Sequence, residues 1–257
     1  MGVLALGAFL FVRRLPRPGM ASRRAWLGMG WLGVSDAMNI LCFFAAYAHT
    51  SVAIAVLTHY LTPIFVAVAS PLLSRERPDA RTFVALGCSF VGLGVLLDPF
   101  SAGLSRADAL GALLGAASAV FYASNVIVNK RLSGTFTSAE LMGYHALVAL
   151  PVLALFVPWA QGGLRGPGAL PIFLGAIGPG LLAGLAFVQG LRRVPPSHAS
   201  ILTFLEPVVA VMLAVLFLGE SFRPQKGIGA LLVLGGAALV VLQGAKAPAP
   251  GSPTATG

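Results

Sequence analysis

The sequence contains very little charge. Lys, Arg, Asp and Glu make up 10% of the 257 residues, whereas an average soluble domain has about a quarter. Hydrophobic residues make up 57%, and the mean hydropathy is +0.88. So few charged side chains cannot cover a water-exposed surface. The composition therefore excludes an ordinary soluble domain and predicts an all-α integral membrane protein.

Cysteine and histidine are also scarce. Cys42 and Cys88 lie singly in apolar segments, without the spacing of a disulfide framework or a zinc site. The histidines do not share a helix face at a spacing of four: they are His49, His59, His145 and His198. The sequence offers no phosphate-binding loop, nucleophile elbow or paired-carboxylate motif. We expect no metal, no cofactor and no enzymatic activity. The rival class, a membrane-embedded enzyme acting on lipid, would need such a constellation.

The formal net charge of +9 does not indicate a nucleic-acid partner. Lys and Arg lie in short connectors or near the ends of apolar runs, as the topology of membrane proteins requires. With the basic connector at 13–25 placed in the cytoplasm, four of the 17 Lys and Arg residues fall outside, namely Arg106, Arg165, Arg223 and Lys226. We therefore expect a multi-pass protein of the cytoplasmic (inner) membrane with a cytoplasmic carboxyl terminus. Its expected partners are membrane lipids and a small-molecule substrate.

Apolar runs between Gly, Pro and Arg clusters predict the membrane spans. The expected full spans are 26–48, 51–74, 80–98, 108–129, 139–158, 169–191, 196–218 and 225–243. Residues 1–12 are apolar but would reach only about 18 Å as a helix, against a hydrocarbon core of about 30 Å. We expect them to be the last part of a helix whose start is missing. The tail 244–257 is expected to be disordered.

Two stretches of the sequence match each other. LTPIFVAVASPLLSRE at 61–76 and LEPVVAVMLAVLFLGE at 205–220 each place Glu thirteen residues after Pro, as Pro63 with Glu76 and Pro207 with Glu220. Each following helix has glycines seven apart, Gly87 with Gly94 and Gly229 with Gly236. Because the first copy ends in a cytoplasmic connector and the second in an external one, we expect inverted repeats. Secondary transporters often use this plan, with a site near the membrane midplane.

On these motifs the chain resembles the drug/metabolite transporter superfamily, specifically its EamA-type members. The resemblance implies two five-helix repeats in a ten-helix bundle. Here it gives a first repeat at 1–98, lacking the first helix, and a second repeat at 108–243. The implied function is secondary transport of a small metabolite or amphipathic compound, with efflux coupled to an ion gradient. A non-transporting or defective truncated protein is the alternative, and a homodimer is left open.

Ionisable residues inside a predicted span are the first candidates for the substrate pathway. Charge within a span costs about 2.5–3.5 kcal/mol on insertion scales, so Asp36 and Glu206 should face an interior cavity. Asp36 shares a helical stripe with Asn39, Phe43 and Tyr47. Interhelical hydrogen bonding is the alternative for Asp36. Glu206 precedes Pro207, which should leave the Thr203 carbonyl unpaired, and it is either a coupling group or a structural feature of the fold.

A second polar stripe runs along the span at 108–129. Ser118, Tyr122, Asn125 and Asn129 recur at helical spacing on an otherwise apolar helix. Tyr122 and Asn125 are the deepest, so we expect them to contact substrate, with interhelical hydrogen bonding as the alternative. The secondary cavity candidates are Tyr144, His145 and Gln189.

Three further motifs favour structural roles. The segment 137–140 matches a capping box, which assigns Glu140 to helix capping. At Pro63 we expect a kink, with the hydroxyls of Thr58 and Thr62 repairing the backbone. The small-xxx-small steps at 111–115 and 180–184 indicate close helix packing.

Overall fold

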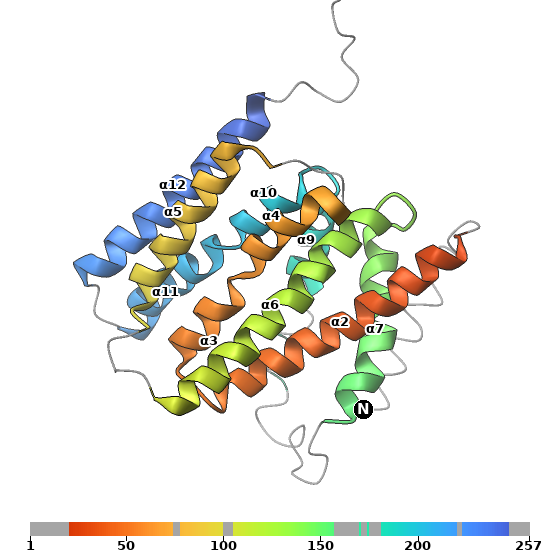
Figure 1. The fold of residues 1–257 in the computed structure, drawn as a ribbon, viewed down its shortest axis with the longest axis horizontal. Helices are drawn as coiled ribbons and strands as arrows, with labels where there is room; N and C mark the ends of the chain where they lie inside the picture. The colour runs from red at the N-terminus through yellow and green to blue at the C-terminus, as the bar shows by residue number, and fades with distance from the viewer. Residues whose placement is uncertain are drawn as a thin grey trace, which may run out of the picture.

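The computed structural model describes residues 21–73, 78–99, 105–156, 170, 174, 181–219 and 223–246. Within these ranges the regular elements are helices, as Figure 1 shows. They are α2 (Arg23–Tyr47), α3 (Val52–His59), α4 (Thr62–Leu73), α5 (Ala80–Leu97), α6 (Arg106–Leu132), α7 (Ser138–Ala154), α9 (Leu182–Leu191), α10 (Pro196–Leu202), α11 (Leu205–Leu218) and α12 (Pro224–Lys246). The all-α prediction is confirmed.

Six stretches of the described chain are long and apolar enough to cross a membrane. They are Arg23–Tyr47, Val52–Leu73, Ala80–Leu97, Arg106–Leu132, Pro196–Leu218 and Pro224–Gln243, while α7 and α9 are shorter apolar helices. Large apolar side chains cover their outer faces, as at Leu72 and Phe217, which are 84% and 78% exposed. Lipid is the solvent that suits such a surface. The predictions for 1–12, Glu76, Glu220 and most of the tail lie outside the described residues, and the ten-helix plan stays a prediction.

The spans that carry the two proline motifs are each divided into two helices. Tyr60 and Leu61 separate α3 from α4, and Thr203 and Phe204 separate α10 from α11. The sequence-based prediction of continuous helices with a proline in the middle is therefore wrong. Each proline instead lies in the first turn of the second helix, where its missing N–H has no intrahelical partner to lose.

The backbone at the two breaks is satisfied in different ways. The Thr62 hydroxyl donates to the His59 carbonyl at 2.8 Å, which confirms the expected repair for Thr62. The expectation for Thr58 is wrong, because its hydroxyl is directed at the carbonyls of Ile54 and Ala55 in its own helix. At the second, the Thr203 carbonyl accepts the backbone N–H of Glu206 at 3.0 Å. The prediction that this carbonyl is unpaired is wrong, because the chain leaves the α-helix and forms a tighter turn.

Helix starts follow ordinary capping chemistry. Thr137 and Glu140 form the predicted capping box of α7, with the Glu140 carboxylate accepting the Thr137 N–H at 2.7 Å. A second capping box, made by Ser105 and Asp108, begins α6. Glu140, which is buried, is therefore used to cap its own helix.

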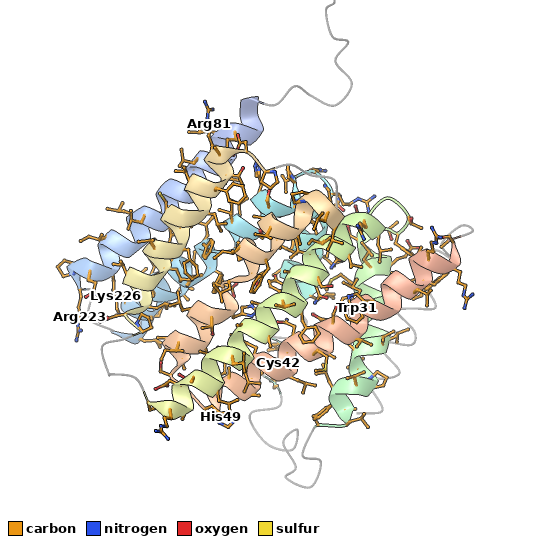
Figure 2. The ribbon with its side chains drawn as sticks, in the orientation of Figure 1. Trp31, Cys42, His49, Arg81, Arg223 and Lys226 are labelled. Carbon is orange, nitrogen blue, oxygen red and sulfur yellow. The ribbon has the colours of Figure 1, made fainter. Side chains whose placement is uncertain are left out.

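Helices α5 and α12 lie side by side and antiparallel at one flank of the bundle (Figure 1). Figure 2 shows Arg81 at one end of this pair and Arg223 and Lys226 at the other. A Cβ added at Gly92 would lie 2.8 Å from the Gly229 carbonyl oxygen, and one at Gly236 would lie 2.6 Å from that of Ala85. These glycines allow the two backbones to touch.

In the first copy the two glycines that lie seven residues apart make no helix contact. Nothing lies within 4 Å of a Cβ built at Gly87 or Gly94, so these glycines face outward. The sequence spacing that carries Pro63 onto Pro207 instead carries Gly92 onto Gly236. Their contacts correspond as well, because Gly92 meets Gly229 and Val233 while Gly236 meets the equivalent residues, Ala85 and Ser89.

Helix α6 crosses the centre of the molecule and contacts α2, α3 and α4 (Figure 1). Gly111 packs against Thr50 and Gly115 against Thr58, which confirms the close packing predicted for the step at 111–115. This close packing brings the polar stripe of α6 toward both α2 and the broken spans. The functional candidates are positioned by these contacts.

Candidate functional site

Two cavities lie inside the bundle on either side of Tyr122. The first has a volume of about 340 Å³ and the second about 500 Å³. Tyr122, Thr203 and Glu206 line both of them. The two cavities therefore meet at the break between α10 and α11, where the carboxylate of Glu206 lines both of them.

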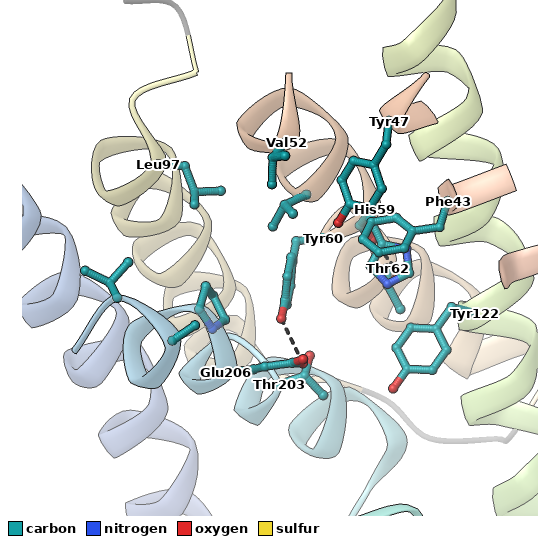
Figure 3. Close-up of a pocket in the computed structure, with 14 residues that line it drawn as sticks. Phe43, Tyr47, Val52, His59, Tyr60, Thr62, Leu97, Tyr122, Thr203 and Glu206 are labelled. Carbon is teal, nitrogen blue, oxygen red and sulfur yellow. Dashed lines mark hydrogen bonds between the residues drawn. The ribbon is translucent and has the colours of Figure 1, made fainter. Parts of the chain in front are cut away.

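The first cavity is lined mainly by rings. Phe43 and Tyr47 come from α2, His59 from α3, Tyr60 from the break that follows it, and Tyr122 from α6 (Figure 3). His59 stacks on Tyr122 with centroids 5.4 Å apart and an interplanar angle of 21°. Its Nδ1 lies 2.8 Å from the Ser118 hydroxyl, which fixes the ring against α6. The rings form a largely apolar wall beside the carboxylate.

Glu206 is the charged group of the first cavity. Its side chain is exposed to the cavity space, and Oε2 accepts the Tyr60 hydroxyl at 3.0 Å, the bond drawn in Figure 3. Tyr60 is in turn held by stacking on Phe204, with centroids 5.4 Å apart and planes 24° apart. A carboxylate with one fixed donor and an open side, among aromatic faces, is suited to a cation, which both the charge and the ring quadrupoles attract.

The second cavity is more polar on its α2, α6 and α7 walls. Asp36, Asn125, Asn129 and His145 line it, together with apolar residues of α9. Asp36 Oδ1 accepts the Asn125 amide at 3.2 Å, and Asp36 Oδ2 lies 3.6 Å from His145 Nε2. The Ser35 hydroxyl donates to Asn125 Oδ1. Asp36 is thus both cavity-lining and part of an interhelical hydrogen-bond network, so the two interpretations made from sequence coexist.

The structure brings most of the predicted pathway residues together. Asp36, Tyr122, Asn125 and Glu206 line the second cavity, and Tyr122 and Glu206 line the first as well. Asn39 lines neither cavity, and among the described residues its Oδ1 is buried without a hydrogen-bond partner. Their roles in transport stay predictions, since position alone does not test them.

Several lining residues were missed or ranked low from sequence. His145, a secondary candidate, pairs with Asp36, while Gln189 bonds the Ser138 hydroxyl at 2.7 Å near the surface and Tyr144 packs against Trp26. Tyr60 was not predicted, because it belongs to the break and has no helical stripe around it. Its place directly before the Leu-Thr-Pro step was the only signal. Within the described ranges, no three His, Cys, Asp or Glu side chains cluster as a metal-binding set.

A helical membrane bundle with broken spans, a central carboxylate and paired cavities is the architecture of a solute carrier. Comparison with known families agrees: the EamA-like transporter family matches residues 1–97 and 109–242. The chain belongs to this family, and the resemblance drawn from the proline motifs is confirmed. The division into repeats at 1–98 and 108–243 stays a prediction.

Several of the curated relatives are named as transporters. An uncharacterized transporter of Archaeoglobus fulgidus is 27% identical over 80% of this chain and 73% of its own length. Protein PecM of Dickeya dadantii is 30% identical over 84% of this chain and 75% of its own. The pseudopaline exporter CntI of Pseudomonas aeruginosa is 29% identical over 58% of this chain. The chain spans about half of that exporter's length, 53%, and 66% of an uncharacterized transporter of Bacillus subtilis.

A solved crystal structure shares the fold. It superposes with a TM-score of 0.71, covering 88% of this chain and 78% of the other, at 22% sequence identity. At that identity the likeness concerns the arrangement of helices alone. It supports the all-α membrane fold in which the cavities lie.

Proposed function

We propose that the protein is a secondary transporter that moves a small amphipathic compound carrying a positive charge, as a cation or a zwitterion, through the two joined cavities. The observation that carries the proposal is the open carboxylate of Glu206, which lines both cavities and is ringed by aromatic side chains in the first. Among the described residues that line these two cavities are Asp36 and Glu206 but no Lys or Arg. An anionic substrate would lack a counter-charge there.

The direction and driving force of the proposed transport are efflux coupled to an ion gradient. Efflux is supported by the relative named as the pseudopaline exporter. Gradient coupling is supported by ionisable side chains within the spans, since such groups are costly in lipid and often carry the coupling ion. The proposed location is the cytoplasmic membrane, with the carboxyl terminus inside. A reporter fused there, active only on the external side, would contradict that topology.

Transport is tested with the full chain reconstituted in liposomes and a screen of fluorescent organic cations, zwitterions and anions of similar size. The expected result is flux of a cation or zwitterion above that of empty liposomes, driven by an imposed ion gradient. Flux restricted to anions contradicts the charge preference. The absence of flux for every compound, with correctly folded protein, contradicts the transport function.

The site assignment is tested by three single variants, Asp36→Asn, Glu206→Gln and Asn125→Ala. Each removes a charge or polar group from a cavity wall, so we expect each to lower flux of the screened compound. The matched control is Gln189→Ala, which removes a polar group of α9 that lines neither cavity. Wild-type flux in all three variants removes these residues from the proposed pathway.

A further inference from the structure

The Asp36–His145 pair stands apart from the carboxylate of Glu206. Asp36 belongs to α2 and His145 to α7, and they face each other across the wall of the second cavity only. Their side chains are 29% and 14% exposed, and His145 Nε2 lies 3.6 Å from Asp36 Oδ2. Both groups therefore lie largely inside the bundle, where an uncompensated charge is costly.

Hydrogen bonding at the other ring nitrogen fixes the tautomer of His145. Nδ1 lies 2.6 Å from the backbone carbonyl oxygen of Leu141. A carbonyl oxygen only accepts, so Nδ1 must carry a hydrogen. The Nε2 that faces Asp36 then bears a lone pair unless a second proton binds. Without that proton, two acceptors would face each other.

The orientation of the carboxylate is also fixed. Asn125 Nδ2 donates to Asp36 Oδ1 at 3.2 Å, and Asn125 Oδ1 faces the Ser35 hydroxyl, whose other acceptor is the Leu32 carbonyl at 3.2 Å. Asp36 Oδ2 is left directed at His145 Nε2. At 3.6 Å these two atoms lie just beyond hydrogen-bond distance, and a single proton on either of them would give the pair a donor.

We propose that the Asp36–His145 pair binds one proton and is the proton site of the carrier, separate from the substrate carboxylate of Glu206. With the proton bound the pair has no net charge, as an ion pair or as two neutral groups. When the proton leaves, the pair has one negative charge. The proposal deepens the proposed function and rests on it for the meaning of the proton, but the proton itself is observable without transport.

The neighbouring titratable groups are few. From α6 Tyr122 lines the same cavity, and from α11 Glu206 does, whereas α9 contributes apolar residues. Glu140 of α7 is held in its capping box, and the ammonium of Lys130 donates to the carbonyls of 191, 192 and 194 at the end of α9. Among the described residues, Glu206 is thus the charged group that shares the cavity with the pair.

A consequence for coupling follows from this placement. Loss of the proton adds a negative charge to a cavity that Glu206 also lines, which strengthens the attraction for a cation. Binding of a cation should in turn favour loss of the proton, because such linkage is reciprocal. Proton and substrate then oppose each other through the electric field, at two sites, instead of competing for one carboxylate.

The test uses the full chain in lipid bilayers at neutral pH without any added ligand. Infrared spectroscopy detects a protonated carboxyl group, and nitrogen NMR of histidine-labelled protein detects a hydrogen on Nε2 of His145, assigned with His145→Gln. We expect one of the two signals in the wild type and its loss in Asp36→Asn, in which the amide can donate to Nε2. An ionised Asp36 together with a bare Nε2 in the wild type overturns the proposal.

Glu206→Gln is the matched control, and it should leave the pair's proton in place. Loss of the signal in this variant but not in Asp36→Asn would assign the proton to Glu206 and overturn the proposal. If Asp36→Asn does not fold, the infrared and NMR spectra of the wild type and of His145→Gln still test whether the pair binds a proton. If the pair binds a proton but no screened compound is transported, the proposed function is contradicted and this inference is not. If a compound is transported but the pair binds no proton, this inference is contradicted and the proposed function is not.

Discussion

The two breaks in the proline-containing spans have similar backbones and different chemistry. The first places Thr62 before Pro63, and the second places Glu206 before Pro207. Thr62 is buried, and its hydroxyl is near two carbonyl oxygens, those of His59 at 2.8 Å and Ala119 at 3.3 Å. Glu206 is exposed to the cavities and accepts the Tyr60 hydroxyl. One copy uses this position for packing, and the other directs it at the space through which a substrate would pass.

The difference follows from how the backbone carbonyl three residues before each Thr62 or Glu206 position finds a hydrogen-bond donor. At the second break the main chain does so itself, through the Glu206 N–H and the Thr203 carbonyl, which leaves the carboxylate available. At the first, a side chain is used. The breaks also meet, because Tyr60 and Phe204 occupy equivalent positions and stack on each other. Two breaks with similar backbones can therefore carry a buried threonine in one copy and a cavity-lining carboxylate in the other.

The largest effect is expected when the second break is made chemically like the first. Glu206→Thr gives both copies the sequence Leu-Thr-Pro and removes the charge that both cavities share. Loss of a contact between a charged group and its partner costs about 1.5 to 3 kcal/mol, so we expect flux of the screened compound to fall roughly 10- to 150-fold. The measurement is the initial rate in liposomes at equal protein content.

The fold should survive this change because the Glu206 side chain is exposed to the cavities. Thermal unfolding of Glu206→Thr should resemble that of the wild type. If flux persists within about threefold, the difference between the two breaks has no role in transport.

The next effect concerns the helices that follow the breaks. Gly236→Ala places a methyl group 2.6 Å from the Ala85 carbonyl oxygen and also against Ser89. Overpacking of this kind costs about 1 to 3 kcal/mol, and the contact is with backbone, which cannot move alone. We expect a lower midpoint of unfolding in detergent, measured by tryptophan fluorescence.

Gly94→Ala is the matched control, because nothing lies within 4 Å of its Cβ position. It should be neutral or slightly stabilising, since Ala is the better helix former. Equal destabilisation by the two variants would contradict the contact between α5 and α12 as described.

A smaller effect is expected at the first break. Thr62→Val keeps the shape of the side chain but removes the donor to the His59 carbonyl. Because hydrogen bonds between groups in membrane proteins contribute about 0.6 to 2 kcal/mol, we expect a loss of stability in that range. Thr62→Ser, which keeps the hydroxyl, should retain most of the stability. If both variants unfold alike, the hydroxyl does not repair this break.

The sequence predicted the fold better than the site. Spans and caps follow from hydropathy and from short motifs such as Thr137 with Glu140, because these signals are local. The breaks at 60–61 and 203–204 were not predicted, since a proline pattern fits both a kink and a new helix start. Likewise, Asp36 was recognised by its charge, but its pairing with His145 depends on the approach of α2 and α7. No local spacing encodes that approach.

The smallest effect concerns the start of α5. Asp79 caps this helix, and its Oδ1 accepts the Thr82 N–H and hydroxyl, each at 2.8 Å. In the second copy α12 begins at Pro224, and the residue before it is Arg223, which has no carboxylate. We therefore expect a cost of about 1 kcal/mol for Asp79→Ala at neutral pH, measured by thermal unfolding.

Acid should reduce this cost of Asp79→Ala. The Thr82 N–H and then its hydroxyl hold the pKa of the Asp79 carboxyl below its ordinary value. A carboxyl whose pKa is lower in the folded state stabilises fully above its unfolded pKa, and that contribution is lost as the pH falls through the folded value. The difference in stability between wild type and Asp79→Ala should therefore shrink below about pH 4.

Ser22 is the control, because it caps α2 with a hydroxyl that does not titrate. Ser22→Ala should cost the same stability at neutral pH and below about pH 4. A difference for Asp79→Ala that stays constant down to the lowest pH at which the protein folds would show that the cap does not depend on the charge of Asp79.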